Sequence, residues 1–177
     1  MKKVLYMFSE LLDEDIDWLG AIGTTHKISR NETLIVEGSI VPALYIVIEG
    51  QFTVTNRFLS SSVGDFTLTS GDIVGEMSFV DGRPSSASVS ANSDCKVLAI
   101  SHDSIGRRIE EKADFGVRFY KSIALFLSLR MRSTTGGMMI SSTQTLEAHD
   151  PDELDENLLE SSTLAALRYE RLCASLS

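Results

Sequence analysis

The sequence predicts an α+β protein in which a compact antiparallel β structure lies between an N-terminal helix and a long C-terminal helix. From His26 to Ser101 the chain consists of short runs of β-branched and aromatic residues, and glycines interrupt these runs at fairly even intervals. Many short strands with regular turn signals are typical of a barrel or a sandwich, not of a βαβ sheet. On both sides of this region, apolar residues recur at helical spacing.

Composition limits the classes of protein to be considered. The chain has 177 residues, of which 43% are hydrophobic and 23% charged, as is typical of a globular domain with an appendage. The apolar stretches are too short to cross a bilayer, and the N-terminus shows no signal-peptide cleavage pattern. We therefore expect a cytoplasmic protein with no membrane partner. Cys95 and Cys173 lie far apart without metal-ligand spacing, so neither a disulfide nor a metal site is expected.

The charge is concentrated at the C-terminal end. The formal net charge is −9, and residues 147–177 carry eight acidic and two basic residues. Binding to nucleic acid requires a basic face that neutralises phosphates, so no nucleic-acid partner is expected. Neither a catalytic triad nor a Walker-type loop nor a pair of carboxylates at a catalytic spacing is present. We therefore do not expect an enzyme, and we assign no catalytic residue.

The N-terminal helix is predicted over Phe8–Gly20, where leucines and isoleucine recur at helical spacing and Ser9 could cap the first turn. Within it, Asp13-Glu14-Asp15 is interpreted as a solvated face. The following strands are predicted at Thr33–Val36, Leu44–Glu49, Phe52–Arg57, Asp65–Thr69, Ala87–Ala91 and Lys96–Ile100.

A long helix is predicted over Asp103–Arg132. One near-heptad row consists of Ile105, Ile109, Lys112, Gly116, Phe119, Ile123, Phe126 and Arg130, and further apolar residues broaden this face. The helix could pack on its own β structure or on a second copy of the chain. Because the apolar face is wide, we favour a homodimer through residues 103–132, with a mixture of both kinds of packing. Gly106 and Gly116 mark a kink or a point of close packing.

The C-terminal part divides into a linker and a tail. Residues 133–149 are rich in Ser, Thr and Gly and predict a linker after a first domain over residues 1–132. Residues 150–177 predict an acidic amphipathic helix that begins at Asp150-Pro151 and carries a row of leucines. This tail is either solvated and frayed or a docking helix for a partner protein or a second subunit.

The order of motifs resembles the cyclic nucleotide-binding domain found in catabolite activator-type regulators, in regulatory subunits of cAMP-dependent protein kinase and in some channels. The resemblance spans about Leu5 to Arg132. It rests on an ordered set of motifs at family-like spacing: Gly38, A-L-Y-I-V-I-E-G ending at Gly50, Gly71-Asp72 and Gly75-Glu76. It implies an antiparallel β-roll, a double-stranded β-helix or jelly-roll-like fold. Transcriptional members continue into a DNA-binding domain, for which the region after Arg132 is too short and too acidic.

The resemblance also implies a ligand site. Residues Gly75–Ala87 correspond to the family's phosphate-binding cassette, and the ligand would be cAMP or cGMP. Glu76 would be a poor ligand for a phosphate because both are anionic, and the family gives this glutamate the ribose 2′-hydroxyl. The candidate ligand-binding residues are Val74, Gly75, Glu76, Met77, Ser78, Arg83, Pro84, Ser85, Ser86 and Ala87.

The sequence departs from the family pattern at the phosphate. The family places an arginine immediately before two small residues, and here Ser85 holds that position, followed by Ser86 and Ala87. Arg83, on the other side of Pro84, could replace it. Alternatively, the hydroxyls of Ser85, Ser86 and Ser88 could hold the phosphate together with backbone donors, or the pocket could have lost cyclic nucleotides.

Two functions follow from these observations. The first is a cytoplasmic cyclic-nucleotide sensor module that signals to a partner protein through its C-terminal helix and acidic tail. The second is a ligand-independent dimeric interaction scaffold with a degenerate pocket, in which the tail makes the contact. Ser85 favours the second function, and Gly75-Glu76 favours the first.

Overall fold

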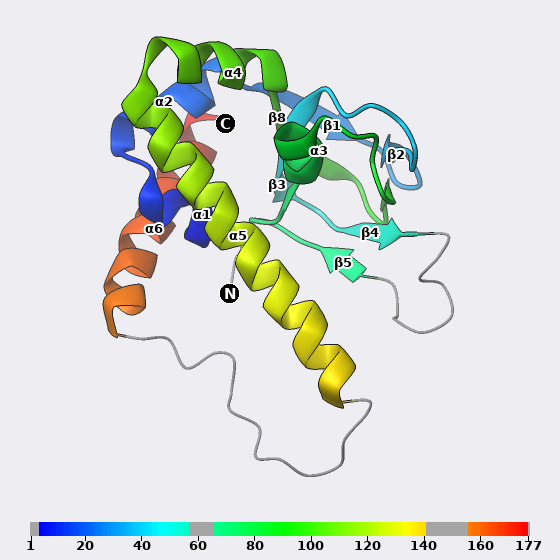
Figure 1. The fold of residues 1–177 in the computed structure, drawn as a ribbon. Helices are drawn as coiled ribbons and strands as arrows, with labels where there is room; N and C mark the ends of the chain where they lie inside the picture. Colours follow the sequence, from blue (N-terminus) through cyan, green and yellow to red (C-terminus); the bar gives the residue numbers. More distant parts are fainter. Residues whose placement is uncertain (1–3, 57–65, 141–155, 177) are drawn as a thin grey trace.

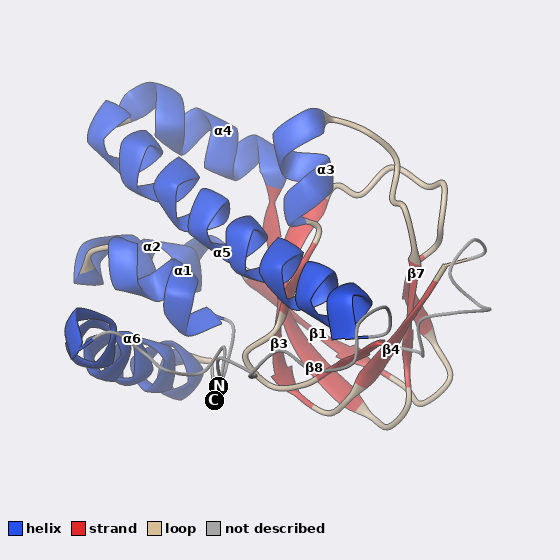
Figure 2. Cartoon of the chain, turned by 60° about the horizontal axis from the view of Figure 1, so that its bottom comes forward, coloured by secondary structure: helices blue, strands red, loops and turns tan. Residues whose placement is uncertain are grey.

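The computed structural model describes residues 4–56, 66–140 and 156–176, and it confirms the predicted α+β class. Two four-stranded antiparallel sheets have the orders β1-β8-β3-β6 and β2-β7-β4-β5. Figures 1 and 2 show these sheets on one side of the molecule and most of the helices gathered on the other. The strands are β1 Thr24–Ile28, β2 Thr33–Ile35, β3 Ala43–Glu49, β4 Phe52–Thr55, β5 Phe66–Leu68, β6 Ile73–Val74, β7 Ser88–Ala91 and β8 Cys95–Ser101.

The sheets agree with the predicted strands, except for β1 and β6, which the sequence does not predict. In β1 only Ile28 is buried, so the apolar-polar alternation that identifies a strand is absent. Pairing with β8 holds it in the sheet. The two residues of β6 pair with Tyr45 and Ile46 of β3 and lead directly into the predicted cassette.

The N-terminal segment forms two helices, α1 Val4–Glu10 and α2 Asp13–Ile22, so the prediction of one helix over Phe8–Gly20 was wrong. The break lies at Leu11-Leu12, where the backbone of Leu12 is extended and its N–H donates to the Asp15 carboxylate at 3.0 Å. The Asp15 carboxylate therefore serves as the acceptor for the Leu12 N–H at the start of α2. The hydroxyl of Ser9 donates to the Tyr6 carbonyl and does not cap a helix.

The interpretation of Asp13-Glu14-Asp15 as a solvated face holds for Asp13 and Glu14, which are exposed, and is wrong for Asp15. Asp15 is fully buried, and its carboxylate accepts two hydrogen bonds from the Arg118 guanidinium, at 2.8 and 3.1 Å. This pair raises the pKa of Arg118. Asp13 accepts from Arg168 at 2.7 Å, and this bond lowers the pKa of Asp13. These acids therefore tie the N-terminal helices to two distant parts of the chain.

The predicted helix over Asp103–Arg132 is also divided. Helix α4, His102–Glu111, ends at Lys112, and α5 runs over Ala113–Ile140, past the predicted end and into the predicted linker. Gly116 allows α5 to approach α4 closely just after the break at Lys112. A Cβ at this position would lie 2.9 Å from Ile109 Cγ2 of α4. By contrast, a Cβ at Gly106 would meet no atom within 4 Å. The near-heptad row therefore crosses two helices that pack on one another.

Helix α5 has two faces with different surroundings. Its inner face is buried in the chain's own core, together with residues of α1 and α6, through Phe115, Phe119, Ile123 and Phe126. Its outer face exposes Val117, Tyr120, Ala124 and Met131. The apolar width that suggested a dimer is thus partly used within one molecule.

Helix α6, Glu156–Ser175, lies against α1 and places Ala165, Tyr169 and Leu172 in the same core. The Tyr169 hydroxyl contacts Ser70 Oγ at 2.9 Å and lies 3.2 Å from the Val47 carbonyl, and burial raises its pKa to about 12. The hydroxyl therefore stays protonated. The predicted helix start at Asp150 lies outside the described residues. Among the described helices, none is long and apolar enough to cross a membrane.

Candidate ligand-binding site

The predicted cassette begins at a glycine that no other residue can replace without strain. β6 ends at Val74, Gly75 takes φ +93°, and helix α3 follows over Glu76–Asp81. A Cβ at Gly75 would lie 2.4 Å from the Ala43 carbonyl oxygen, below any normal contact distance. The left-handed backbone and this close approach both require glycine. The turn sets the direction in which Glu76 leaves the strand.

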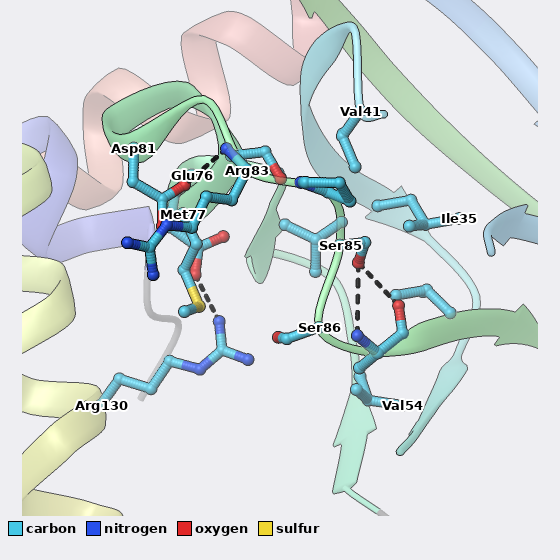
Figure 3. A pocket seen from close by; sticks show the side chains of 16 residues that line it. Ile35, Val41, Val54, Glu76, Met77, Asp81, Arg83, Ser85, Ser86 and Arg130 are labelled. Atoms are coloured by element: carbon cyan, nitrogen blue, oxygen red, sulfur yellow. Dashed lines mark hydrogen bonds and ion pairs between the residues drawn. The ribbon is translucent and has the colours of Figure 1, made fainter. Parts of the chain in front are cut away.

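A cavity of about 220 Å³ opens beside α3 (Figure 3). All ten predicted ligand-binding residues line it, including those on both sides of the Gly82 turn. The structure adds an apolar wall from the strands and the segment before β3, Asp81 at the end of α3, and one residue from α5. The complete lining is Ile35, Val41, Val54, Val74, Gly75, Glu76, Met77, Ser78, Asp81, Arg83, Pro84, Ser85, Ser86, Ala87, Val89 and Arg130.

The residue from α5, Arg130, was not predicted as a site residue. Its Nη1 lies 2.5 Å from Glu76 Oε1, and Figure 3 shows the side chain reaching toward Glu76 from α5. Glu76 is 1% exposed, whereas the Arg130 side chain is 31% exposed. A carboxylate buried to this extent requires a cation or several hydrogen-bond donors. Arg130 provides the cation, so α5 is attached to the cassette at this point.

The sequence holds a signal for Arg130 that the prediction did not use. Phe119, Ile123, Phe126 and Arg130 recur at intervals of four, three and four residues, and the three apolar members are buried. Because positions at this spacing share one face of a helix, Arg130 must face inward with them. An arginine that continues a buried apolar row is a candidate partner for a buried acid.

Arg83, the predicted substitute for the missing arginine, lines the cavity from its rim. Its side chain is 83% exposed, and its Nε lies 4.0 Å from Asp81 Oδ2. Its backbone N–H also donates to Asp81 Oδ1 at 3.0 Å. Such an exposed pair contributes little to stability. The structure therefore places Arg83 beside the cavity without directing its guanidinium to Glu76 or Ser85 by any described contact.

Ser85 and Ser86 line the side of the cavity opposite α5, and their hydrogen bonds lie within the protein. The Ser85 hydroxyl donates to the Ala87 carbonyl at 2.7 Å, and the Ser85 backbone bonds in both directions with the loop at Gly38 and Ser39. The Ser86 carbonyl accepts from Asn56 Nδ2. The hydroxyl of Ser88, another predicted phosphate donor, accepts from the Glu37 N–H. These contacts fix the backbone from Ser85 to Ser88 at the cavity edge.

The formal charges lining the cavity cancel. Among the described lining residues, Glu76 and Asp81 are acidic and Arg83 and Arg130 are basic. Arg130 is the more buried of the two cations. Among the described residues, no group of three His, Cys, Asp or Glu side chains could hold a metal ion. The cavity thus combines a buried acceptor, a nearby cation and an apolar wall, which suits a sugar phosphate bearing a ring system.

Comparison with solved structures shows the same fold in several bacterial proteins. A cyclic nucleotide-binding domain from Methylobacillus flagellatus is 20% identical, with a TM-score of 0.70 over 82% of this chain and 85% of that one. The N-terminal domain of a transcriptional regulator from Streptomyces coelicolor is 24% identical, with a TM-score of 0.61 over 80% and 99%. The catabolite activator protein of Thermus thermophilus is 18% identical, with a TM-score of 0.64 over 97% and 86%.

No curated protein sequence matches the chain significantly. The sequence profile described as the cyclic nucleotide-binding domain matches residues 25–112, from β1 to the end of α4. This range includes Gly75, Glu76 and the whole cassette, and it ends before α5. Together with the β-roll and the position of the cavity, the match shows that residues 25–112 belong to the cyclic nucleotide-binding domain family.

Proposed function

We propose that the cavity binds a cyclic mononucleotide, cAMP or cGMP, and that the protein is a regulatory sensor module. The single observation that supports this most is the Glu76 carboxylate, which is almost completely buried beside a cavity within the family segment. It can accept a hydrogen bond from a ribose 2′-hydroxyl, and hydrogen bonds to charged groups are among the strongest. Ile35, Val41, Val54 and Val89 offer an apolar surface for the sugar and the base.

A ligand-independent scaffold is the second candidate, and a specific observation favours it. The polar groups at the cavity already have partners: Arg130 neutralises Glu76, and the Ser85 hydroxyl bonds to Ala87. Polar groups that have partners within the protein do not require a ligand. A pocket of this kind would remain stable while empty.

Calorimetric titration separates the two candidates. We expect purified protein to release or absorb heat on titration with cAMP or cGMP, and the same ligands to raise its melting temperature, because a ligand that binds only the folded state stabilises it. Cyclic dinucleotides serve as the size control for a cavity of about 220 Å³. Absence of both heat and thermal shift with millimolar cAMP and cGMP would leave the scaffold as the function.

We also propose a homodimer through the outer face of α5. Val117, Tyr120, Ala124 and Met131 recur at intervals of three, four and seven residues, as in a coiled-coil seam. Val117 is 69% exposed and Tyr120 is 50% exposed, so among the described residues much of this seam faces solvent. A second copy presents the same seam and can cover it isologously.

Substitutions on the seam test the dimer. We expect Val117→Glu combined with Ala124→Glu to convert the dimer to a monomer in sedimentation velocity, since four glutamates would then face one another across the interface. Ile40→Glu is the control, because Ile40 is 82% exposed on a loop outside α5. A wild-type protein that sediments as a monomer at about 100 µM would contradict the proposal.

Signalling to a partner protein is proposed to involve α5 and α6. Helix α6 uses its buried face within the molecule, so a partner would meet the exposed residues Leu164 and Leu167. Both cysteines are free thiols, which is consistent with the reducing cytoplasm proposed as the location. The chain's net charge of −9 supports a protein partner over nucleic acid or an anionic membrane surface.

A further inference from the structure

An anionic ligand in this cavity needs a cation at the position where the family pattern has an arginine and this chain has Ser85. A cyclic mononucleotide carries one negative charge on its phosphodiester, and Glu76 beside it carries another. At the short distances within a cavity, two like charges repel strongly unless a cation lies nearby. Ser85 is uncharged and its hydroxyl is bonded to the Ala87 carbonyl. The required positive charge must therefore come from elsewhere in the lining.

Of the two lining cations in the described chain, Arg130 is the better placed. Arg83 projects into solvent and lies near Asp81, whereas Arg130 lies between α5 and the cassette and is in contact with Glu76. A guanidinium presents five N–H donors in a rigid plane, so one edge can bind a carboxylate while another edge binds a phosphate oxygen. A contact with Glu76 is therefore compatible with a second contact to an anion.

The helix that carries Arg130 is anchored at its other end. Arg118, twelve residues earlier on α5, forms the bidentate pair with the buried Asp15 of α2. Between the two arginines, Phe119, Ile123 and Phe126 pack in the core. The start of α5 is thus fixed independently of the cavity, while Arg130 lines the cavity beyond the last of these buried apolar side chains. Arg130 therefore has two roles: it joins this part of α5 to the cassette through Glu76, and it contributes a positive charge to the cavity.

We propose that Arg130 replaces the missing cassette arginine by binding the ligand's phosphate from α5 while it remains paired with Glu76. This inference rests on the proposed function of the cavity. Its consequence is that ligand affinity depends on α5: a ligand held by Arg130 binds conformations in which α5 lies over the cassette more tightly than conformations in which it does not. Such a difference in affinity is what allows a ligand to shift a conformational equilibrium. Occupancy of the cavity would then act directly on the position of α5.

The test compares three substitutions by calorimetry with cAMP. Arg130→Gln keeps a donor for Glu76 but removes the charge, and Arg130→Lys keeps the charge but removes the planar fork. Arg132→Gln is the matched control, since Arg132 is an exposed arginine on the same helix. We expect Arg130→Gln to weaken binding about 10- to 150-fold, the effect of one hydrogen bond to a charged group. Arg130→Lys should recover part of this loss, and Arg132→Gln should bind like wild type.

Two further readouts distinguish a direct contact from a structural role. The affinity of the wild type for cAMP should fall as NaCl rises from about 0.05 to 0.5 M, and the fall should be smaller for Arg130→Gln because salt screens the contact that this variant lacks. Hydrogen exchange at the amides of residues 124–132 should slow on cAMP binding in the wild type and change less in Arg130→Gln.

The outcomes are separable. Wild-type affinity in Arg130→Gln would overturn the role of Arg130 and leave the proposed function intact. If Arg130→Gln and Arg130→Lys lost the same cAMP affinity, and if that affinity depended on NaCl as it does in the wild type, Arg130 would be only a structural support for Glu76. Absence of binding by the wild type would reject both the role of Arg130 and the proposed function.

Discussion

Asp15→Ala is expected to lower the free energy of unfolding by about 3–5 kcal/mol, the range for removing one partner of a buried ion pair. Asp15 is fully buried, and its carboxylate accepts two hydrogen bonds from Arg118 and one from the Leu12 N–H. Because the Arg118 side chain is 23% exposed, water can partly replace the lost acceptor, and we expect the lower part of this range. Urea denaturation of purified protein measures the difference.

The adjacent residue provides the control. Glu14 lies on the same turn of α2 and is exposed, so Glu14→Ala should change stability by about 0.5 kcal/mol or less. A loss for Asp15→Ala no greater than that for Glu14→Ala would show that the pair with Arg118 does not hold α5 in place. The result matters for function, because this pair fixes the start of the helix that carries Arg130.

Gly75→Ala is expected to abolish ligand binding and to lower the melting temperature. A non-glycine residue in the left-handed region costs about 1–3 kcal/mol. In addition, the new Cβ would lie 2.4 Å from the Ala43 carbonyl oxygen, so β3 or the cassette must shift. Since the turn at Gly75 directs Glu76 into the cavity, the shift should remove the acceptor for the ribose hydroxyl. Thermal melting and calorimetric titration with cAMP measure the two effects.

Gly82→Ala separates the backbone strain from the collision. Gly82 also has a positive φ, of +67°, but a Cβ there would meet no atom within 4 Å. This variant should show only the smaller loss that belongs to the left-handed backbone, with binding retained. If Gly75→Ala and Gly82→Ala lost the same stability, the close approach of Gly75 to Ala43 would be unimportant.

The cassette could be predicted from the sequence because its chemistry is local. Gly75, Glu76, Arg83 and Ser85 lie within one short segment, and the turns at Gly75 and Gly82 that bring them to one cavity are specified by the glycines themselves. The departure at Ser85 is visible because this segment resembles the family's cassette and aligns with it without gaps. No long-range contact is needed to locate this half of the site.

Arg130 and Asp15 could not be assigned their partners in this way. Arg130 reaches Glu76 across 54 positions of sequence, and Arg118 reaches Asp15 across 103. Each contact depends on the direction of α5, which is set by the break at Lys112 and the close packing of Gly116 on Ile109. A continuous helix from Asp103 to Arg132 would have carried both arginines elsewhere. Tertiary packing, not helix propensity, determines these breaks.

The central claim is that Glu76 binds a ribose 2′-hydroxyl, and a double-mutant cycle tests it most directly. Affinities are measured for wild type and Glu76→Gln, each with cAMP and with 2′-deoxy-cAMP. The account predicts that removing the hydroxyl weakens binding to the wild type about 10- to 150-fold, and weakens binding to Glu76→Gln far less, because the charged acceptor is already gone. The account would be contradicted if removal of the 2′-hydroxyl weakened binding equally in the two proteins, or if the wild type did not bind cAMP at all.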